Sequence, residues 1–252
     1  MIALYRIGLV GCVAWLVTGQ VLAAVLTEGD VQINGEQVIV GQQTDGLLTL
    51  TAPAQLTSSQ LLVAQNQGVV GDVVIDAGGW TAENEVLIGE RGIGSLTVRN
   101  GGQFSQEFGQ FTVGQFGIGS LIVEGLGSTV DLGATSRATQ LVVGGNEQGG
   151  FGPLGRGDVT IRDGGELRTG RASIATSGTA AVILDGPDSR WLNSGTISFG
   201  NADVTIRGGA ALVDLVERRN SIVLGAEGGA TNLLLTGAGT LLSTNGVQGI
   251  TI

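Results

Sequence analysis

Short alternating strands recur along the chain, and each ends in Ala or Gly. Their spacing is about 25 residues in most units and about 30 residues in two, and self-similarity at a fixed period in this range is the signature of repeat architectures. The pattern therefore predicts a column of about seven repeated coils. The seven strands close at Ala64, Gly89, Gly114, Gly144, Ala175, Gly200 and Gly225.

Each unit then contains a second strand, marked by two apolar residues that are two positions apart. Residues at that spacing point to the same face of a strand, so we expect both members of each pair to face the core. In the third unit Leu121 and Val123 should point inwards while Ile122 points outwards, and Val182, Leu184 and Ile183 repeat this pattern. The seven pairs are Val73/Ile75, Leu96/Val98, Leu121/Val123, Val159/Ile161, Val182/Leu184, Val204/Ile206 and Leu233/Leu235.

A glycine turn follows each pair, and a bulky apolar residue comes after the turn. Four of these turns contain Gly-Gly, and the other three have the sequence Gly-x-x-Ser or Gly-x-x-Thr. The bulky residue predicts a third short strand in each coil. These residues are Trp80, Phe104, Val130, Leu167, Trp191, Leu212 and Leu241.

A helical interpretation fails because glycine costs about 1 kcal/mol relative to alanine in a helix interior. Glycine is suited instead to sharp corners, where φ is positive. Each period of strands and glycine corners is therefore one coil of a solenoid, and equivalent strands of successive coils stack in parallel about 4.8 Å apart. The sequence therefore predicts an all-β fold, a right-handed parallel β-helix.

The two ends of the repeat region are less regular than its middle. Residues 25–60 alternate without a clean unit, so we expect an irregular first coil or an N-terminal cap. Residues 131–140 and 145–154 lengthen two units and predict corner loops. Ile250 and Ile252 match the first strand of an eighth unit, and we expect the repeat region 61–252 to be truncated there.

Residues 1–24 have the pattern of a secretory signal peptide. Arg6 provides the positive n-region, residues 7–17 are apolar, and small residues stand at a cleavage point before residue 25. A membrane-spanning helix and a lipoprotein box around Cys12 are alternatives, but the apolar run is short and Cys12 comes early in it. The mature chain would then contain no cysteine, since Cys12 is the only one.

Composition excludes several classes of function. The 46 glycines amount to more than twice the ordinary share of about 7%. The formal net charge is −10 and every basic residue is Arg, so we expect no nucleic-acid partner. The chain has no His and no Lys, which removes the commonest general base and the phosphate-loop lysine. We expect no cofactor and no metal.

The turn motifs resemble those of a known family. The pattern V-x-G-x-x-G-x-G-x-L-x-V-x-x-G-G, as in residues 87–102 with Leu87 at its first position, alternates with G-x-G-S-x-W, whose closest match is residues 186–191 with Asp188 in the usual Gly position. Together these are similar to the type V secretion and PEP-CTERM-associated repeat, over roughly residues 61–252. The resemblance implies a parallel β-helix like an autotransporter passenger domain, secreted or on the cell surface or outer membrane of a Gram-negative bacterium. It also implies a C-terminal translocator, whose pattern we do not find in this sequence.

The acidic residues are the candidates for chemistry, because some parallel β-helices cleave polysaccharides. Glycoside hydrolysis needs two carboxylates about 5–10 Å apart. The nearest pairs in sequence are Asp185 with Asp188 and Asp158 with Asp163, but Asp at a corner commonly caps turn backbone. A polysaccharide enzyme would present acidic and Arg residues together on one outward face of adjacent coils, and the spacing alone does not show such a cluster.

Two further candidates have structural explanations. Trp80 and Trp191 could stack on sugars, but their place after the turn indicates the core. Residues 149–152 lack the Asp of a calcium-binding β-roll repeat. We therefore expect no catalytic, cofactor-binding or metal residue. The predicted function is a structural or adhesive surface protein whose partner is a host-surface, matrix or cell-surface ligand, or a second copy at the open end. A polysaccharide lyase or glycosidase is the alternative.

Overall fold

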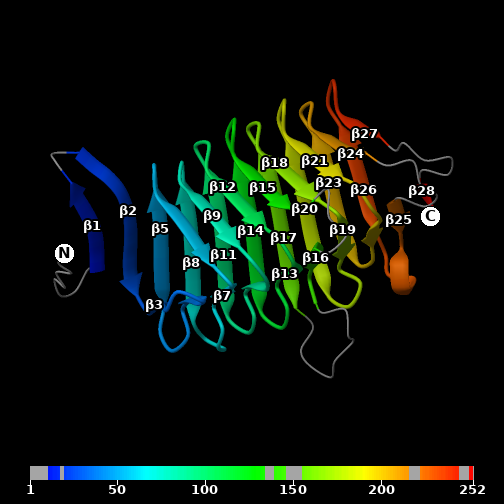
Figure 1. Cartoon of the computed structure of the whole chain (residues 1–252). Helices are drawn as coiled ribbons and strands as arrows, with labels where there is room; N and C mark the ends of the chain where they lie inside the picture. Colours follow the sequence, from blue (N-terminus) through cyan, green and yellow to red (C-terminus); the bar gives the residue numbers. More distant parts are fainter. Residues whose placement is uncertain are drawn as a thin grey trace.

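The chain winds into a column of stacked strands that belong to three parallel sheets (Figure 1). The computed structural model describes residues 11–17, 20–133, 139–145, 155–215, 222–243 and 250–251. Each coil adds one strand to sheet B, then one to sheet A and one to sheet C. The predicted all-β parallel solenoid, with about seven coils and the repeat length expected from the strand spacing, is confirmed. Its right-handed winding stays a prediction.

The strands of the three sheets have the following bounds, given in chain order. Sheet A contains β1 (Gly11–Val17), β2 (Gln20–Gly29), β5 (Gly46–Thr51), β8 (Val70–Asp76), β11 (Ile93–Arg99), β14 (Ile118–Glu124), β17 (Arg156–Arg162), β20 (Thr179–Asp185), β23 (Ala202–Arg207) and β26 (Asn232–Thr236). Sheet B contains β3 (Val31–Ile33), β4 (Gln37–Val40), β7 (Gln60–Val63), β10 (Val86–Ile88), β13 (Gly109–Val113), β16 (Thr139–Val143), β19 (Arg171–Ile174), β22 (Ile197–Phe199), β25 (Ile222–Leu224) and β28 (Ile250–Thr251). Sheet C contains β6 (Gln55–Ser58), β9 (Gly79–Ala82), β12 (Gln103–Gln106), β15 (Thr129–Leu132), β18 (Glu166–Thr169), β21 (Arg190–Asn193), β24 (Ala211–Asp214) and β27 (Leu241–Ser243).

The register of sheet A places equivalent side chains of successive coils in straight rows along the column. Leu121 pairs with Leu96 on one side and with Val159 on the other, and all three are fully buried. Ile122 lies between Leu121 and Val123 on the opposite face of β14 and is partly exposed. Ile183 is placed in the same way on β20. The predicted inward and outward positions are confirmed.

The third strand of each coil begins at its predicted bulky residue or one residue before it, and it carries a bulky side chain into the core. Trp80, Phe104 and Trp191 are at most 2% exposed, and the ring centroids of Trp80 and Phe104 are 6.3 Å apart. β27 begins at Leu241, as the sequence predicts, but the side chain that enters the core is the next one. Leu242 pairs with the buried Leu212 and packs against the core, whereas Leu241 faces outwards. After a turn that ends in Ser or Thr, the inward residue stands two positions beyond the hydroxyl, and Leu242 holds that place.

Two kinds of turn alternate between sheets A and C from the coil of β11 onwards. A Gly-Gly turn in one coil is followed by a Gly-x-x-Ser or Gly-x-x-Thr turn in the next. The Ser189 hydroxyl accepts a hydrogen bond from the Gly164 N–H of the preceding coil at 3.1 Å and donates one to the Asp185 carbonyl at 2.7 Å. Ser128 caps Gly101 and Thr240 caps Gly209 in the same position. Because each hydroxyl closes the turn of its neighbour, coils are stabilised in pairs.

The N-terminal region contains a complete coil, β4 to β6, which pairs in parallel with the next coil in all three sheets. Before it the pairing becomes antiparallel, between β3 and β4, between β1 and β2, and between β2 and β5. Asp30 fixes the corner after β4, because its Oδ2 accepts hydrogen bonds from the backbone N–H groups of Gln42 and Gln43. Region 25–60 thus holds one regular coil and an antiparallel edge. Cleavage of the leader stays a prediction.

At the other end, β28 adds in parallel to β25, as the match of Ile250 to a first strand predicts. Leu235 continues the inward row of Ile206, yet it is 43% exposed. Residues 146–154 of the predicted loop and residues 134–138 of the segment 131–140 lie outside the described residues, and the ends of that segment belong to β15 and β16. Within the described chain, the single helical turn η1 (Ala226–Gly228) is far shorter than a membrane-crossing helix, and no longer apolar helix occurs.

Candidate binding surface

A row of alternating charges follows the edge of sheet A at the last position of each strand. The register aligns Asp76, Arg99, Glu124, Arg162, Asp185 and Arg207 in successive coils. Arg99 contacts Asp76 at 2.9 Å and Arg207 contacts Asp185 at 2.8 Å, while Arg162 bonds to Glu124. Each arginine thus pairs with the acid of the preceding coil, and we call this row the charge ladder.

The charge ladder corrects the expectation that acidic and Arg residues do not gather on one outward face of adjacent coils. The signal was present in the sequence, because each of these residues follows the second member of an inward apolar pair. The geometry nevertheless differs from that of a catalytic groove, since the charges are paired with one another along the column. Exposed pairs of this kind contribute about 0.2–1 kcal/mol each, so the ladder favours the register of the coils more than their total stability.

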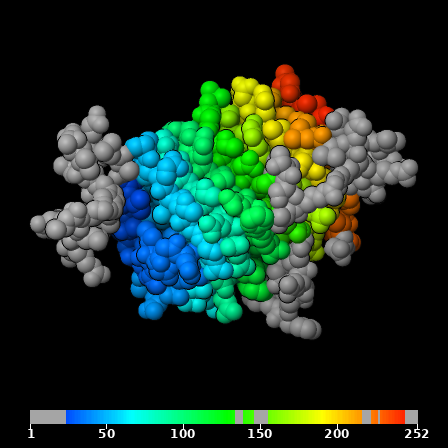
Figure 2. Space-filling model, in the orientation of Figure 1, coloured from blue at the N-terminus to red at the C-terminus, as the bar shows by residue number. Residues whose placement is uncertain are grey.

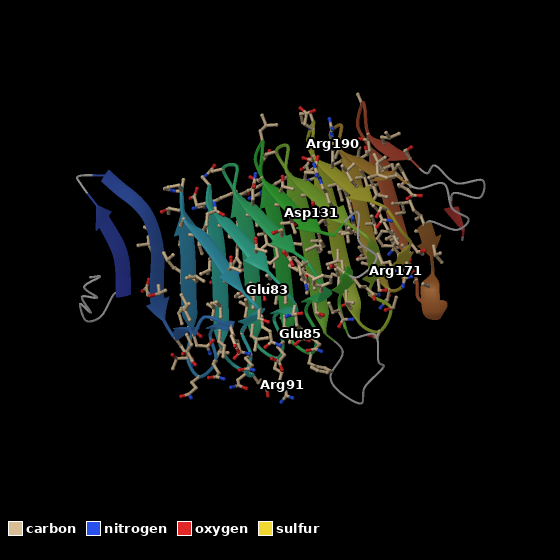
Figure 3. All side chains as sticks on the ribbon, viewed as in Figure 1. Glu83, Glu85, Arg91, Asp131, Arg171 and Arg190 are labelled. Carbon is tan, nitrogen blue, oxygen red and sulfur yellow. The ribbon has the colours of Figure 1, made fainter. Side chains whose placement is uncertain are left out.

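The ion pairs of the described chain extend beyond this row. Six of its eight arginines lie within 4.0 Å of a carboxylate. Arg91 and Arg190 stand at opposite edges of the column (Figure 3), so the cations are spread over the molecule. This distribution offers no extended positive surface among the described residues. The absence of a nucleic-acid partner stays a prediction.

The four acidic candidates from the sequence each lie beside an arginine. Asp185 contacts Arg207 at 2.8 Å, Asp188 contacts Arg190 at 3.7 Å, Asp158 contacts Arg156 at 3.3 Å and Asp163 contacts Arg162 at 3.9 Å. Asp163 and Asp188 have positive φ values of 55° and 65°, as expected for Asp at corners.

The structure does not bring either of the two acidic pairs together across a groove. Asp158 and Asp163 are five residues apart along one extended strand and its end, so their Cα atoms are separated by up to about 17 Å. Asp185 and Asp188 bracket an exposed turn instead of facing each other over a cleft in the described surface. No arrangement of two carboxylates about a sugar bond follows from these positions.

The two tryptophans considered as sugar platforms belong to the core. The Trp80 indole N–H donates to the Ser58 hydroxyl at 3.0 Å, and the Trp191 indole N–H donates to the Thr169 hydroxyl at 2.8 Å. Both bonds are buried, so neither ring faces solvent. Among the described residues, no three His, Cys, Asp or Glu side chains come together as a metal site would require.

A shallow polar groove crosses the outer face of sheet C from β6 to β18. Its volume is about 340 Å³, and its floor is the backbone of β9 and β12 above the buried Trp80 and Phe104. The side chains that line it are Gln55, Thr81, Gln103, Ser105, Thr129, Asp131 and Arg168. The sequence reasoning missed this groove, because no charged or aromatic motif marks it.

One of the coils that line the groove lacks a side chain. Gly79 stands in a row with Gln55 on one side and Gln103 on the other. A Cβ at Gly79 would collide with the side-chain amide of Gln55, which lies over this position. Gly79 does not have a positive φ, so its backbone does not require glycine. Glycine at a strand position of this kind often marks a place where a ligand or another chain approaches closely.

The corner between sheets B and A carries a row of amide side chains interrupted by one acid. Gln42 donates to Gln65 at 2.7 Å, and Glu90 follows in the next coil with Gln115 after it. Partial burial raises the pKa of the Glu90 carboxyl, Glu85 adds to this shift, and Arg91 and Gln65 oppose it. An acid whose pKa is higher in the folded than in the unfolded state lowers the free energy of unfolding when it is ionised. This loss of stability disappears at a pH where the acid is protonated in both the folded and the unfolded state.

We therefore expect Glu90→Gln to raise the melting temperature at pH 7, because glutamine continues the amide row without a charge. The gain should shrink as the pH falls through the raised pKa of Glu90 towards 4.5, the ordinary value for this group, and it should vanish below 4.5, where the wild-type carboxyl is protonated in both the folded and the unfolded state. Thermal denaturation at several pH values measures the difference. Glu83→Gln, at an exposed position nearby, is the control, and an equal gain from it would assign the effect to net charge alone.

Comparison of the chain with protein-family models, with curated proteins and with solved structures gave no match.

Proposed function

We propose that this chain is a secreted or surface-exposed structural and adhesive β-solenoid, similar in design to an autotransporter passenger domain. The observation that carries the proposal is the charge ladder. Its acidic and basic groups are engaged with each other between coils, which holds a long column in register and occupies the carboxylates that a hydrolase would use. The repeat motifs that resemble the type V secretion and PEP-CTERM-associated family support the same function, as does the leader-like segment 1–24.

The outward residues of the column favour attachment over chemistry. The surface is acidic overall, with a formal net charge of −10, and its charges are distributed over several coils instead of one cleft. The column grows coil by coil from one end to the other (Figure 2), so a binding surface can repeat along its length. Repeated weak contacts along a rigid column raise avidity without requiring one deep site.

The proposal is tested with beads that carry the purified mature chain. We expect such beads to remain attached to cells or extracellular matrix under flow, while beads coated with serum albumin are released. Acidic and neutral polysaccharides incubated with the same protein should yield no cleavage product. Turnover that Asp185→Asn or Asp188→Asn abolishes would replace the proposal with a polysaccharide lyase or glycosidase.

Association between copies is a further part of the proposal. Leu234, Leu235 and Leu241 are 56%, 43% and 46% exposed in the last described coil, beside the edge of the sheets. We expect the chain to self-associate through this end, more strongly as salt screens its negative charge. Sedimentation at several salt concentrations measures this, and a monomer at every concentration would contradict it.

A further inference from the structure

We propose that the sheet C groove over Gly79 binds a neutral, hydroxyl-rich glycan chain that lies along the column axis. The inference rests on the proposed adhesive function and names the chemistry of its ligand. It follows from three observations on the described surface: the missing side chain at Gly79, the polar lining of the groove, and the spacing of that lining along the column.

The lining presents both hydrogen-bond donors and acceptors in adjacent coils. Gln55 and Gln103 each carry an amide that donates through nitrogen and accepts through oxygen. The hydroxyls of Thr81 and Ser105 lie 3.1 Å apart, in the row next to these amides. A sugar offers the same mixture of hydroxyl donors and acceptors, whereas an apolar ligand would leave these groups without partners.

The spacing of the coils suits a polymer of sugars. Successive strands of sheet C are about 4.8 Å apart, close to the length of one pyranose residue. The groove crosses five strands, so it extends for about 19 Å along the column. Each coil can therefore offer a polar contact to successive sugars, and over Gly79, which has no side chain, the Gln55 amide provides that contact.

Charge favours a neutral glycan over an acidic one. Among the described residues that line the groove, Arg168 is the only cation, and it bonds to Glu166 and lies 4.0 Å from Asp131. Its positive charge is therefore balanced at the site, and the chain as a whole is strongly negative. A polyanionic glycan would be repelled, and its carboxylates would find no cation that lacks an acidic neighbour among the lining residues.

The decisive variant is Gly79→Gln, which gives this coil the residue that both neighbouring coils already have. The new side chain displaces the Gln55 amide from this coil and narrows the groove. The backbone at position 79 accepts it because its φ is not positive and the atoms it meets are the far end of the flexible Gln55 side chain. Ala211→Gln is the matched control. Ala211 occupies the same outward row, but beyond Arg190 and away from the groove. Both variants should keep the circular dichroism spectrum and the melting temperature of the wild type.

Binding is measured by calorimetry with cellohexaose as the neutral probe and hexagalacturonate as the acidic probe. We expect the wild type and Ala211→Gln to bind cellohexaose equally, and Gly79→Gln to bind it at least about tenfold more weakly. Equal binding by Gly79→Gln, no binding of cellohexaose by the wild type, or preference for hexagalacturonate would each overturn the inference. Beads that adhere to cells in spite of such a result would leave the proposed adhesive function standing, and beads that fail to adhere would refute that function separately.

Discussion

Leu121→Asp should unfold the middle of the column, while Ile122→Asp should leave it folded. Leu121 is fully buried between Leu96 and Val159, so an aspartate there would place an ionised group in the core without a partner. We expect a loss of at least about 4 kcal/mol, the range that marks a buried unpaired charge. Ile122 points to the outer face, where a carboxylate stays hydrated, and about 1 kcal/mol should be lost.

Hydrogen exchange followed by mass spectrometry measures this difference best, because a repeat column need not unfold as a single unit. Exchange in Leu121→Asp should rise first in β11, β14 and β17 and then spread to both sides. Leu184→Asp and Ile183→Asp repeat the comparison two coils further along. If the two members of either pair had equal effects, the strand would be shifted by one residue from the register described above.

The sequence predicts the fold well because the solenoid is specified locally and then repeated. Each inward pair, such as Val182 and Leu184, is fixed by its two-residue spacing, and each corner by its glycine. The neighbouring coils repeat the same sequence pattern, so a position that is ambiguous in one coil can be assigned from the equivalent position in the others. In the last unit two leucines stand side by side, and the sequence alone does not decide whether Leu241 or Leu242 faces the core.

The candidate surface was harder to predict because it depends on how coils align. Asp76 and Arg99 are far apart in sequence, and their contact follows only when β8 and β11 are in register. The groove is harder still, because its lining comes from five coils and one of them contributes only Gly79, which has no side chain. In a glycine-rich chain, one more glycine after a turn looks like part of the corner.

Pairing of coils links the turns to the charge ladder. From the coil of β11 onwards, coils with a Gly-Gly turn carry the arginines Arg99, Arg162 and Arg207, and those with a hydroxyl-containing turn carry Glu124 and Asp185. Both features therefore have a period of two coils. Joining coils of the same kind would place like charges opposite each other and leave a turn without its hydroxyl cap, so the alternation disfavours shifts by one whole coil.

The corner between sheets B and A provides the second large effect, at Gly114. Its φ is +72°, and a Cβ there would collide with the backbone carbonyl of Arg156 in the next coil. Gly114→Ala should therefore cost about 2–5 kcal/mol, the sum of about 1–2 for a left-handed alanine and about 1–3 for overpacking. The collision involves backbone on both sides, so a change of rotamer cannot relieve it.

Ala175 is the matched control because it occupies the same corner two coils later. Its φ of 52° lies within the left-handed region that residues with a Cβ can adopt, and the alanine is already accommodated and buried. Ala175→Gly removes the left-handed strain but also loses a buried methyl group and gives the unfolded chain more freedom. The relief of strain is worth about 1–2 kcal/mol and each of the two losses costs about 0.5–1 kcal/mol, so the gain and the losses should nearly cancel. Thermal and denaturant unfolding of the two variants, with hydrogen exchange at β13 and β16, compares them directly. A Gly114→Ala protein as stable as the wild type would show that the coils move apart at little cost, and that glycine at this corner is not what keeps successive coils in contact.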